Sequence, residues 1–258
     1  MKRFFHYLIL IPMVALLVFM IILLTTHSKE VQAVLDTVAE SESVSWEETA
    51  QIKETILISE TETEVGLEIP KDAWYLRLVN ENNPLPDDYV PTLSEVYEGY
   101  EFDSRAAEYL IAMIEAGNRE GLQLKICSAY RTVEKQSVLF KEQIAQQRAD
   151  GLSEAEAVSE AKRAVAYPGR SEHNLGLAAD IVAKNYQMLD DGFADTEEAI
   201  WLKEHCAEYG FILRYPKDKT EITQVIYEPW HFRYVGVEAA TYIMENDLCL
   251  EEYLDLAE

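Results

Sequence analysis

The sequence predicts an α+β domain over residues 72–258, preceded by two segments of different composition. Strand-like and helix-like segments alternate along this region, but without the regular βαβ order that builds a doubly wound parallel sheet. Hydrophobic residues make up 48% of the 258-residue chain, which is enough for a core of domain size. We therefore expect an α+β fold rather than an α/β fold.

The composition also excludes some classes of partner and site. The formal net charge of -25 argues against a nucleic-acid partner, because phosphate binding needs clustered Lys and Arg. The three cysteines, Cys127, Cys206 and Cys249, are an odd number and lack C-x-x-C spacing. They indicate neither a disulfide framework nor a cysteine zinc site.

Residues 1–27 are predicted to form a cytoplasmic tip and a transmembrane signal anchor. Lys2 and Arg3 precede the uncharged run Tyr7–Leu24, which is long enough to span a bilayer. This charge order fits a cytoplasmic N-terminus and an extracytoplasmic domain at the cell membrane. The alternative is a cleaved signal peptide, but the small-residue segment Val31–Ala33 lies well beyond the apolar run.

Residues 28–71 are predicted to form an acidic, flexible stem. Eleven acidic residues stand against Lys29 and Lys53 between residues 28 and 68. Such a segment repels itself and buries little apolar surface. We expect it to hold the domain away from the membrane.

The first elements of the domain are predicted as a strand, a turn-rich segment and a helix. Residues 74–79 alternate as in a strand, and the prolines within residues 80–91 force extended backbone. The apolar spacing that follows predicts a helix capped by Ser104 and ended by Gly117 and Gly121.

The middle of the domain is predicted as a short strand and two helices. Residues 122–128 form the strand and deliver Tyr130 and Arg131 to its end. Thr132 caps a helix that runs to about residue 148, and Gly151 separates it from a second helix over residues 153–166.

The last third is predicted to contain three strands and one helix. A turn at residues 167–170 places the segment from Ser171 in a loop. The expected elements are a strand at 177–182, a helix at 196–209 stopped by Gly210, and strands at 211–215 and 224–227.

Three residues have the chemistry of a zinc site that keeps an open position. His173 and Asp180 lie seven residues apart, and His231 ends the run Glu228-Pro229-Trp230-His231. Two histidines and one carboxylate are a catalytic zinc set, and Glu228 adds a carboxylate that could take a proton from water. His205 is instead expected as a solvated histidine on a helix.

These residues belong to motifs that resemble those of a known family. Ser171-x-His173-x-x-Gly176-x-Ala178-x-Asp180, followed by Glu228-x-x-His231, is similar to the VanY-type zinc D-alanyl-D-alanine carboxypeptidases. That family lies within the lysostaphin, D-Ala-D-Ala metallopeptidase and hedgehog fold group. The resemblance covers about residues 74–236 and implies a small antiparallel sheet with flanking helices and a zinc site on the sheet face.

The resemblance also implies a role for each site residue. One zinc ion per domain would be bound by His173, Asp180 and His231, and Glu228 would be the general base. The substrate would be contacted by Arg131, Ser171, Gln136, Tyr130 and Trp230. Four of them have a structural alternative: Arg131 could pair with an acidic neighbour, Ser171 could cap a turn, Gln136 could be a helix-surface residue and Trp230 could be a core residue.

The implied function is a zinc-dependent D,D-carboxypeptidase that removes the C-terminal D-alanine from peptidoglycan stem peptides or their precursors. Two alternatives stay open. One is an L,D-carboxypeptidase acting on tetrapeptide stems, which uses the same metal chemistry. The other is a non-catalytic cell-wall binding module of the same fold.

Overall fold

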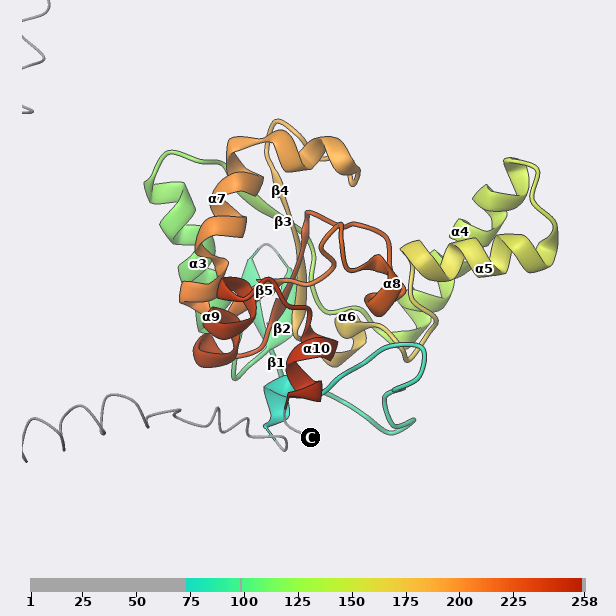
Figure 1. The fold of residues 1–258 in the computed structure, drawn as a ribbon, viewed down its shortest axis with the longest axis horizontal. Coiled ribbons are helices and arrows are strands. Elements are labelled where there is room, and N and C mark those ends of the chain that lie inside the picture. The colour runs from blue at the N-terminus through green and yellow to red at the C-terminus, as the bar shows by residue number, and fades with distance from the viewer. Residues whose placement is uncertain (1–72, 98, 257–258) are drawn as a thin grey trace, which may run out of the picture. The chain divides into compact units, whose positions relative to one another are not determined.

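A four-stranded antiparallel sheet organises the domain (Figure 1). In the computed structural model, which describes residues 73–97 and 99–256, its strand order is β3-β4-β6-β5. The strands are β3 (Leu124–Ser128), β4 (Ala178–Ala183), β6 (His231–Tyr234) and β5 (Phe211–Leu213). All six residues of β4 are buried, as expected of a strand that is central in its sheet.

The register of the sheet places three functional positions side by side. Asp180 on β4 pairs with His231 on β6 and, on its other side, with Ser128 at the end of β3. Asp180, His231 and Ser128, which are far apart in sequence, therefore lie on adjacent strands of the sheet.

A separate two-stranded hairpin precedes the first long helix. It consists of β1 (Leu93–Tyr97) and β2 (Tyr100–Asp103), which pair antiparallel. Gly99 in its turn has φ +85°, a conformation that side chains with a Cβ rarely adopt. The hairpin was not predicted, because the prolines before it obscure the alternation of its short strands.

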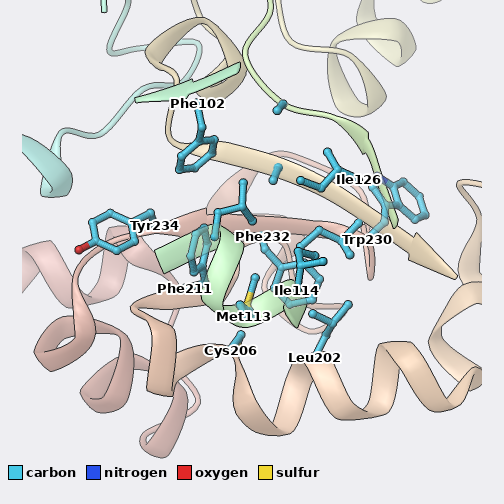
Figure 2. Packing of buried hydrophobic residues seen from close by; sticks show 14 of the residues in the cluster. Phe102, Met113, Ile114, Ile126, Leu202, Cys206, Phe211, Trp230, Phe232 and Tyr234 are labelled. Carbon is cyan, nitrogen blue, oxygen red and sulfur yellow. The ribbon is translucent and has the colours of Figure 1, made fainter. Parts of the chain in front are cut away.

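Helices cover one face of the sheet and form the main core with it (Figure 2). These are α3 (Ala107–Arg119), α7 (Glu197–His205), η3 (Cys206–Tyr209) and α9 (Val237–Glu245). The hairpin strand β2 also contributes Phe102, and Met244 of α9 packs against the cluster at its edge. The buried side chains that meet there include Phe102, Met113, Ile114, Ile126, Leu202, Cys206, Phe211, Trp230 and Phe232. Complete burial of each large side chain contributes about 1.5–3 kcal/mol.

A helical hairpin, α4 (Val133–Ala149) and α5 (Glu154–Ala164), extends from one side of the sheet (Figure 1). Thr132 caps α4 by accepting a hydrogen bond from the Lys135 amide at 3.1 Å. Ser153 and Glu156 form a capping box at the start of α5. Both predicted helices are therefore confirmed.

The remaining elements are short, and the last of them, α10, lies near the C-terminus. They are η1 (Trp74–Leu76), α6 (Glu172–Leu175), η2 (Asp191–Asp195), α8 (Thr220–Thr223) and α10 (Leu250–Asp255). A second buried cluster includes residues from η1, α9 and α10, among them Leu76, Ile243, Leu250 and Tyr253.

Two predicted strands were wrong. Residues 74–79 begin with η1 and contain no strand, because the buried side chains Leu76 and Val79 are three residues apart rather than two. Residues 224–227 contain no strand either, because Gln224 ends α8 with φ +61°. The strand forms later, as β6.

The predicted start of α3 was also wrong, whereas its end was predicted in part, because Gly121, with φ +96°, directly follows the C-cap residue Glu120. Its N-cap is Ala106 rather than Ser104, and no side chain caps it. Gly117 lies inside the helix, where its missing Cβ leaves room for Leu124; an added Cβ would lie 2.4 Å from that side chain. The glycine is there for close packing and does not end the helix.

The α+β class is confirmed, and the sheets are small and antiparallel. Within residues 73–97 and 99–256, no helix is long and apolar enough to cross a membrane. The predicted anchor and stem, residues 1–71, lie outside the described residues.

Candidate active site and metal centre

The segment from Ser171 to Asp180 folds as one helical turn followed by a buried strand. Ser171 caps α6, with its Oγ accepting from the His173 amide at 3.3 Å. Gly176 then reverses the chain with φ +85°. This turn was predicted as an irregular loop; its short helix directs His173 back over Asp180 on β4.

The predicted zinc ligands lie together in the fold. His173 Nε2 is 3.2 Å from Asp180 Oδ2, and His231 Nδ1 is 3.1 Å from Asp180 Oδ1. One potential ligand atom from each residue falls within 4.8 Å of the others, and all three residues are buried. The two imidazole rings are perpendicular, with centroids 5.0 Å apart.

This donor set fits zinc. Two imidazoles and one carboxylate match a catalytic zinc site with an open coordination position. Asp180 Oδ1 is buried and has no hydrogen-bond partner among the described residues, as expected of an oxygen meant for a cation. His173 Nδ1 lies 2.6 Å from the Ala129 carbonyl, so that nitrogen carries the proton and leaves Nε2 free as a ligand.

The electrostatics of the two histidines differ. Burial and Arg131 lower the pKa of His173 to about 4. Burial also lowers the pKa of His231, but Asp180 and Glu172 overcome this and raise it to about 9. Burial would raise the pKa of Asp180, yet the adjacent histidines and Arg131 hold it well below its usual range. Asp180 is therefore an anion at neutral pH.

Glu228 lies beside the ligands in the turn that leads into β6. Its amide donates to the Tyr215 carbonyl, and its own carbonyl accepts from the His231 amide. Glu228 Oε2 is 3.5 Å from His231 Nδ1. Burial raises the pKa of Glu228 to about 8, with Asp180 adding to the shift and His231 opposing it. A carboxyl group that titrates near neutrality suits proton transfer.

Arg131 reaches the ligand set from the end of β3. Its Nη2 donates to Asp180 Oδ2 at 2.6 Å and lies 2.9 Å from His173 Nε2. Its other nitrogens donate to Ser128 Oγ at 2.7 Å and Gln136 Oε1 at 3.3 Å. These contacts hold the guanidinium in a fixed orientation at the site. Arg131 does pair with an acidic neighbour, Asp180, which the sequence analysis gave as an alternative to a substrate contact.

The other predicted substrate contacts have mixed positions. Gln136 is fully buried and donates to the Ala166 carbonyl at 2.8 Å, so it braces Arg131 rather than lying on a helix surface. Ser171 is buried and Tyr130 half-buried beside the ligands, and Trp230 belongs to the main core while contributing to the same cavity wall.

A cavity of about 950 Å³ contains this chemistry. The three zinc ligands, Glu228 and all the predicted substrate contacts line it, together with residues of α4 and the segment at 225–226. Another cavity, of about 670 Å³, lies between α7 and α9 and contains none of the predicted site residues.

A buried charge network behind the ligands was not foreseen. Glu172 Oε1 accepts from Arg214 Nε at 2.7 Å and from Arg233 Nη1 at 2.8 Å. Arg214 also forms a two-pronged pair with Glu251. The available signal was the presence of Arg233 within an apolar run, since a buried charge must be paired.

Tyr215 was also missed. Its ring packs 4.8 Å from that of His231 and lines the cavity. The predicted strand at 211–215 contained it, but nothing in its local pattern distinguishes a cavity residue from a core aromatic.

The chain is similar to proteins of a known family. The family described as VanY, D-alanyl-D-alanine carboxypeptidase, matches residues 99–237. A D-alanyl-D-alanine carboxypeptidase of Enterococcus faecalis is 46% identical over 184 residues, covering 70% of this chain and 66% of that protein. The chain thus spans slightly less than two thirds of that relative.

Solved structures of related proteins have a similar fold. A mutant of the vancomycin resistance D,D-pentapeptidase VanY, from a VanB-type cassette and in complex with Zn(II), aligns with TM-score 0.64 at 45% identity. The match covers 70% of this chain and 99% of that one. The LdcB LD-carboxypeptidase aligns with TM-score 0.59 at 38% identity, covering 70% and 86%. The chain therefore belongs to the VanY family, described as D-alanyl-D-alanine carboxypeptidases.

Proposed function

We propose that this protein removes the C-terminal D-alanine from peptidoglycan stem peptides or their precursors, as a D,D-carboxypeptidase. The observation that carries the proposal is the buried set His173, Asp180 and His231, with Glu228 and Arg131 beside it in one cavity. The names of the related proteins support the choice of substrate.

The chain supplies the groups that amide hydrolysis needs. His173, Asp180 and His231 would hold a zinc ion, which would supply a lowered pKa for a bound water and polarisation of the scissile carbonyl. Glu228 takes the proton from the attacking water and passes it to the leaving amine of D-alanine. Its raised pKa places this exchange near neutral pH.

Arg131 is proposed to hold the substrate's terminal carboxylate. A guanidinium fork matches a carboxylate in shape, and Ser128 and Gln136 keep the fork oriented. Ser171, Tyr130 and Trp230 are proposed to form the surrounding wall. Exact placement of the terminal carboxylate would make the enzyme a carboxypeptidase rather than an endopeptidase.

The test is release of D-alanine by the purified protein from two peptides. One is a pentapeptide stem ending in D-Ala-D-Ala, and the other is the tetrapeptide that remains after its first cleavage. We expect release from the pentapeptide and its loss when zinc is chelated. Release from the tetrapeptide alone would overturn the D,D assignment, and release unaffected by chelation would overturn the metal mechanism.

An L,D-carboxypeptidase is the second candidate, and one observation favours it. The LdcB LD-carboxypeptidase shares the fold at 38% identity over 70% of this chain. A non-catalytic wall-binding module is less well supported, because a chain relieved of catalysis need not keep Glu228 together with all three ligands.

We also propose that the domain is extracytoplasmic and held at the cell membrane by residues 7–24, with residues 28–71 as an acidic stem. The uncharged run and the preceding Lys2 and Arg3 support this. Alkaline phosphatase fused after residue 71 should be active in cells and sediment with membranes. Activity in the soluble periplasmic or secreted fraction would instead indicate a cleaved leader.

A further inference from the structure

Glu172 precedes a zinc ligand in sequence but its side chain faces the other histidine. Its carboxylate is completely buried, and Oε2 lies 3.5 Å from His231 Nε2. Neither of these two buried atoms has a hydrogen-bond partner among the described residues. A buried donor and a buried acceptor that face each other without other partners are expected to pair, because each would otherwise lose its hydrogen bonds to water.

The opposite nitrogen of His231 faces the metal set. Nδ1 lies 3.1 Å from Asp180 Oδ1, so His231 must present Nδ1 as the ligand and keep the proton on Nε2. For His173 the same requirement is met by the Ala129 carbonyl at 2.6 Å from its Nδ1. Glu172 is the only described group with a free acceptor placed to do this for His231.

The rest of the network fixes the position of Glu172. Its other oxygen, Oε1, accepts from both Arg214 and Arg233. Arg233 is in turn anchored to the backbone carbonyls of Tyr75 and Arg77, each at 2.9 Å. Two buried guanidinium groups therefore hold the carboxylate in place, aimed at the imidazole.

We propose that Glu172 is a positioning residue, whose carboxylate orients His231 and fixes its proton on Nε2 so that Nδ1 binds zinc. The inference rests on the zinc-peptidase function proposed above. Arg214 and Arg233 make the carboxylate rigid, and they act on the metal only through it.

The substitution Glu172→Gln tests this directly. The two arginines require the amide oxygen at the Oε1 position, so the amide NH2 replaces the acceptor that faces His231. Nε2 then meets a donor, and the proton moves to the nitrogen that should bind zinc. We expect zinc affinity, measured by competition with a chromogenic chelator, to fall by about 10–100-fold.

The matched control is Glu251→Gln, which weakens the same network but lies on the far side of Arg214 from His231. It should lower the melting temperature and leave zinc affinity within about twofold. Equal zinc affinity in Glu172→Gln and the parent would overturn the proposal. An equal loss in both variants would also overturn it, by showing that the network only stabilises the fold.

A second readout does not depend on affinity. In the zinc-loaded parent, ¹⁵N NMR of the histidines should show His231 protonated at Nε2 with a slowly exchanging proton. In Glu172→Gln the signal of the Nε2 proton should be absent or in rapid exchange. An unchanged signal in the variant would contradict the proposal. If Glu172→Gln does not fold, Glu172→Asp replaces it: the shorter acid keeps its charge for the arginines but withdraws from Nε2, so the same losses are expected.

These measurements are separate from the test of function. A protein that releases no D-alanine from either peptide, yet loses zinc affinity on Glu172→Gln, would disprove the proposed function and keep the role of Glu172. If the parent releases D-alanine and Glu172→Gln keeps the parent's zinc affinity, the proposed function stands and the role of Glu172 is disproved.

Discussion

At the scale of single residues, the proposed role of Glu228 as the general base can be tested directly by substitution. The substitution Glu228→Gln keeps the size of the side chain but removes its basicity. We expect D-alanine release to fall by about 10²–10⁴-fold, because the proton of the attacking water loses its acceptor. Bound zinc, measured by metal analysis, should stay at the parent's level, since Glu228 is not one of the three proposed ligands.

The matched control for that substitution is Glu221→Gln, an exposed glutamate on α8. It should leave hydrolysis unchanged. Undiminished release by Glu228→Gln would assign the base to another residue.

Zinc affinity should depend on pH through His231. Its pKa of about 9 means that the zinc-free imidazole is protonated at pH 7, facing Asp180, Glu172 and Glu228. Zinc must displace that proton from Nδ1, so affinity should rise by about tenfold per pH unit between pH 7 and 9. His173, with a pKa of about 4, adds nothing in this range.

Calorimetry in buffers of different ionisation enthalpy would measure the effect. About one proton should be released per zinc bound at pH 7, and fewer above pH 9. Release of no proton at pH 7 would show that His231 is already neutral in the zinc-free protein.

The three proposed ligands and the proposed base could be inferred from the sequence because each lies in a short motif. His173, Asp180, Glu228 and His231 all occur within ten-residue stretches whose spacing is visible in the chain. Glu172 lies inside one of those stretches and was still missed. Its role depends on arginines that arrive from β6 and from the end of β5, and this is tertiary information.

At the scale of elements, the link between η3 and β5 controls how β6 is positioned. Gly210 has φ +78°, and a Cβ placed there would lie 2.8 Å from the Tyr234 ring and 3.0 Å from the Val237 amide nitrogen. Gly210→Ala should therefore combine backbone strain of about 1–2 kcal/mol with overpacking of about 1–3 kcal/mol. Chemical denaturation would measure the loss in free energy of unfolding.

Gly121→Ala separates those two costs. Gly121 has φ +96° but nothing within 4 Å of an added Cβ. Its free energy of unfolding should therefore fall only by the backbone strain, about 1–2 kcal/mol. Equal losses in both variants would mean that the packing around Gly210 relaxes freely.

Elements were predictable where local chemistry determines them. The helices α4 and α5 begin at Thr132 and Ser153, whose caps are visible in the sequence. The strand β6 was placed too early, because its four residues His231–Tyr234 are all buried and show no alternation. Its position is set by pairing with β4 and β5 on either side.

At the scale of the whole molecule, the proposed zinc site joins segments that lie far apart in the sequence. Its ligands come from α6, β4 and β6, so their geometry exists only once the sheet has formed. A ligand that binds the folded state alone shifts the folding equilibrium toward it. The metal should therefore stabilise the entire domain as well as serve its chemistry.

Zinc at a hundredfold excess over its dissociation constant should add about 2.7 kcal/mol to the free energy of unfolding. For a domain of this size that corresponds to a rise in melting temperature on the order of 5–10 °C. His231→Ala should lose most of this zinc-dependent rise. His205→Ala should keep it, because His205 ends α7 paired with Glu208 at 2.7 Å and lies outside the ligand set. Scanning calorimetry of both variants, with and without zinc, measures the difference. A full zinc-dependent rise in His231→Ala would place the metal on other ligands, and its loss in His205→Ala would make that histidine the missing one.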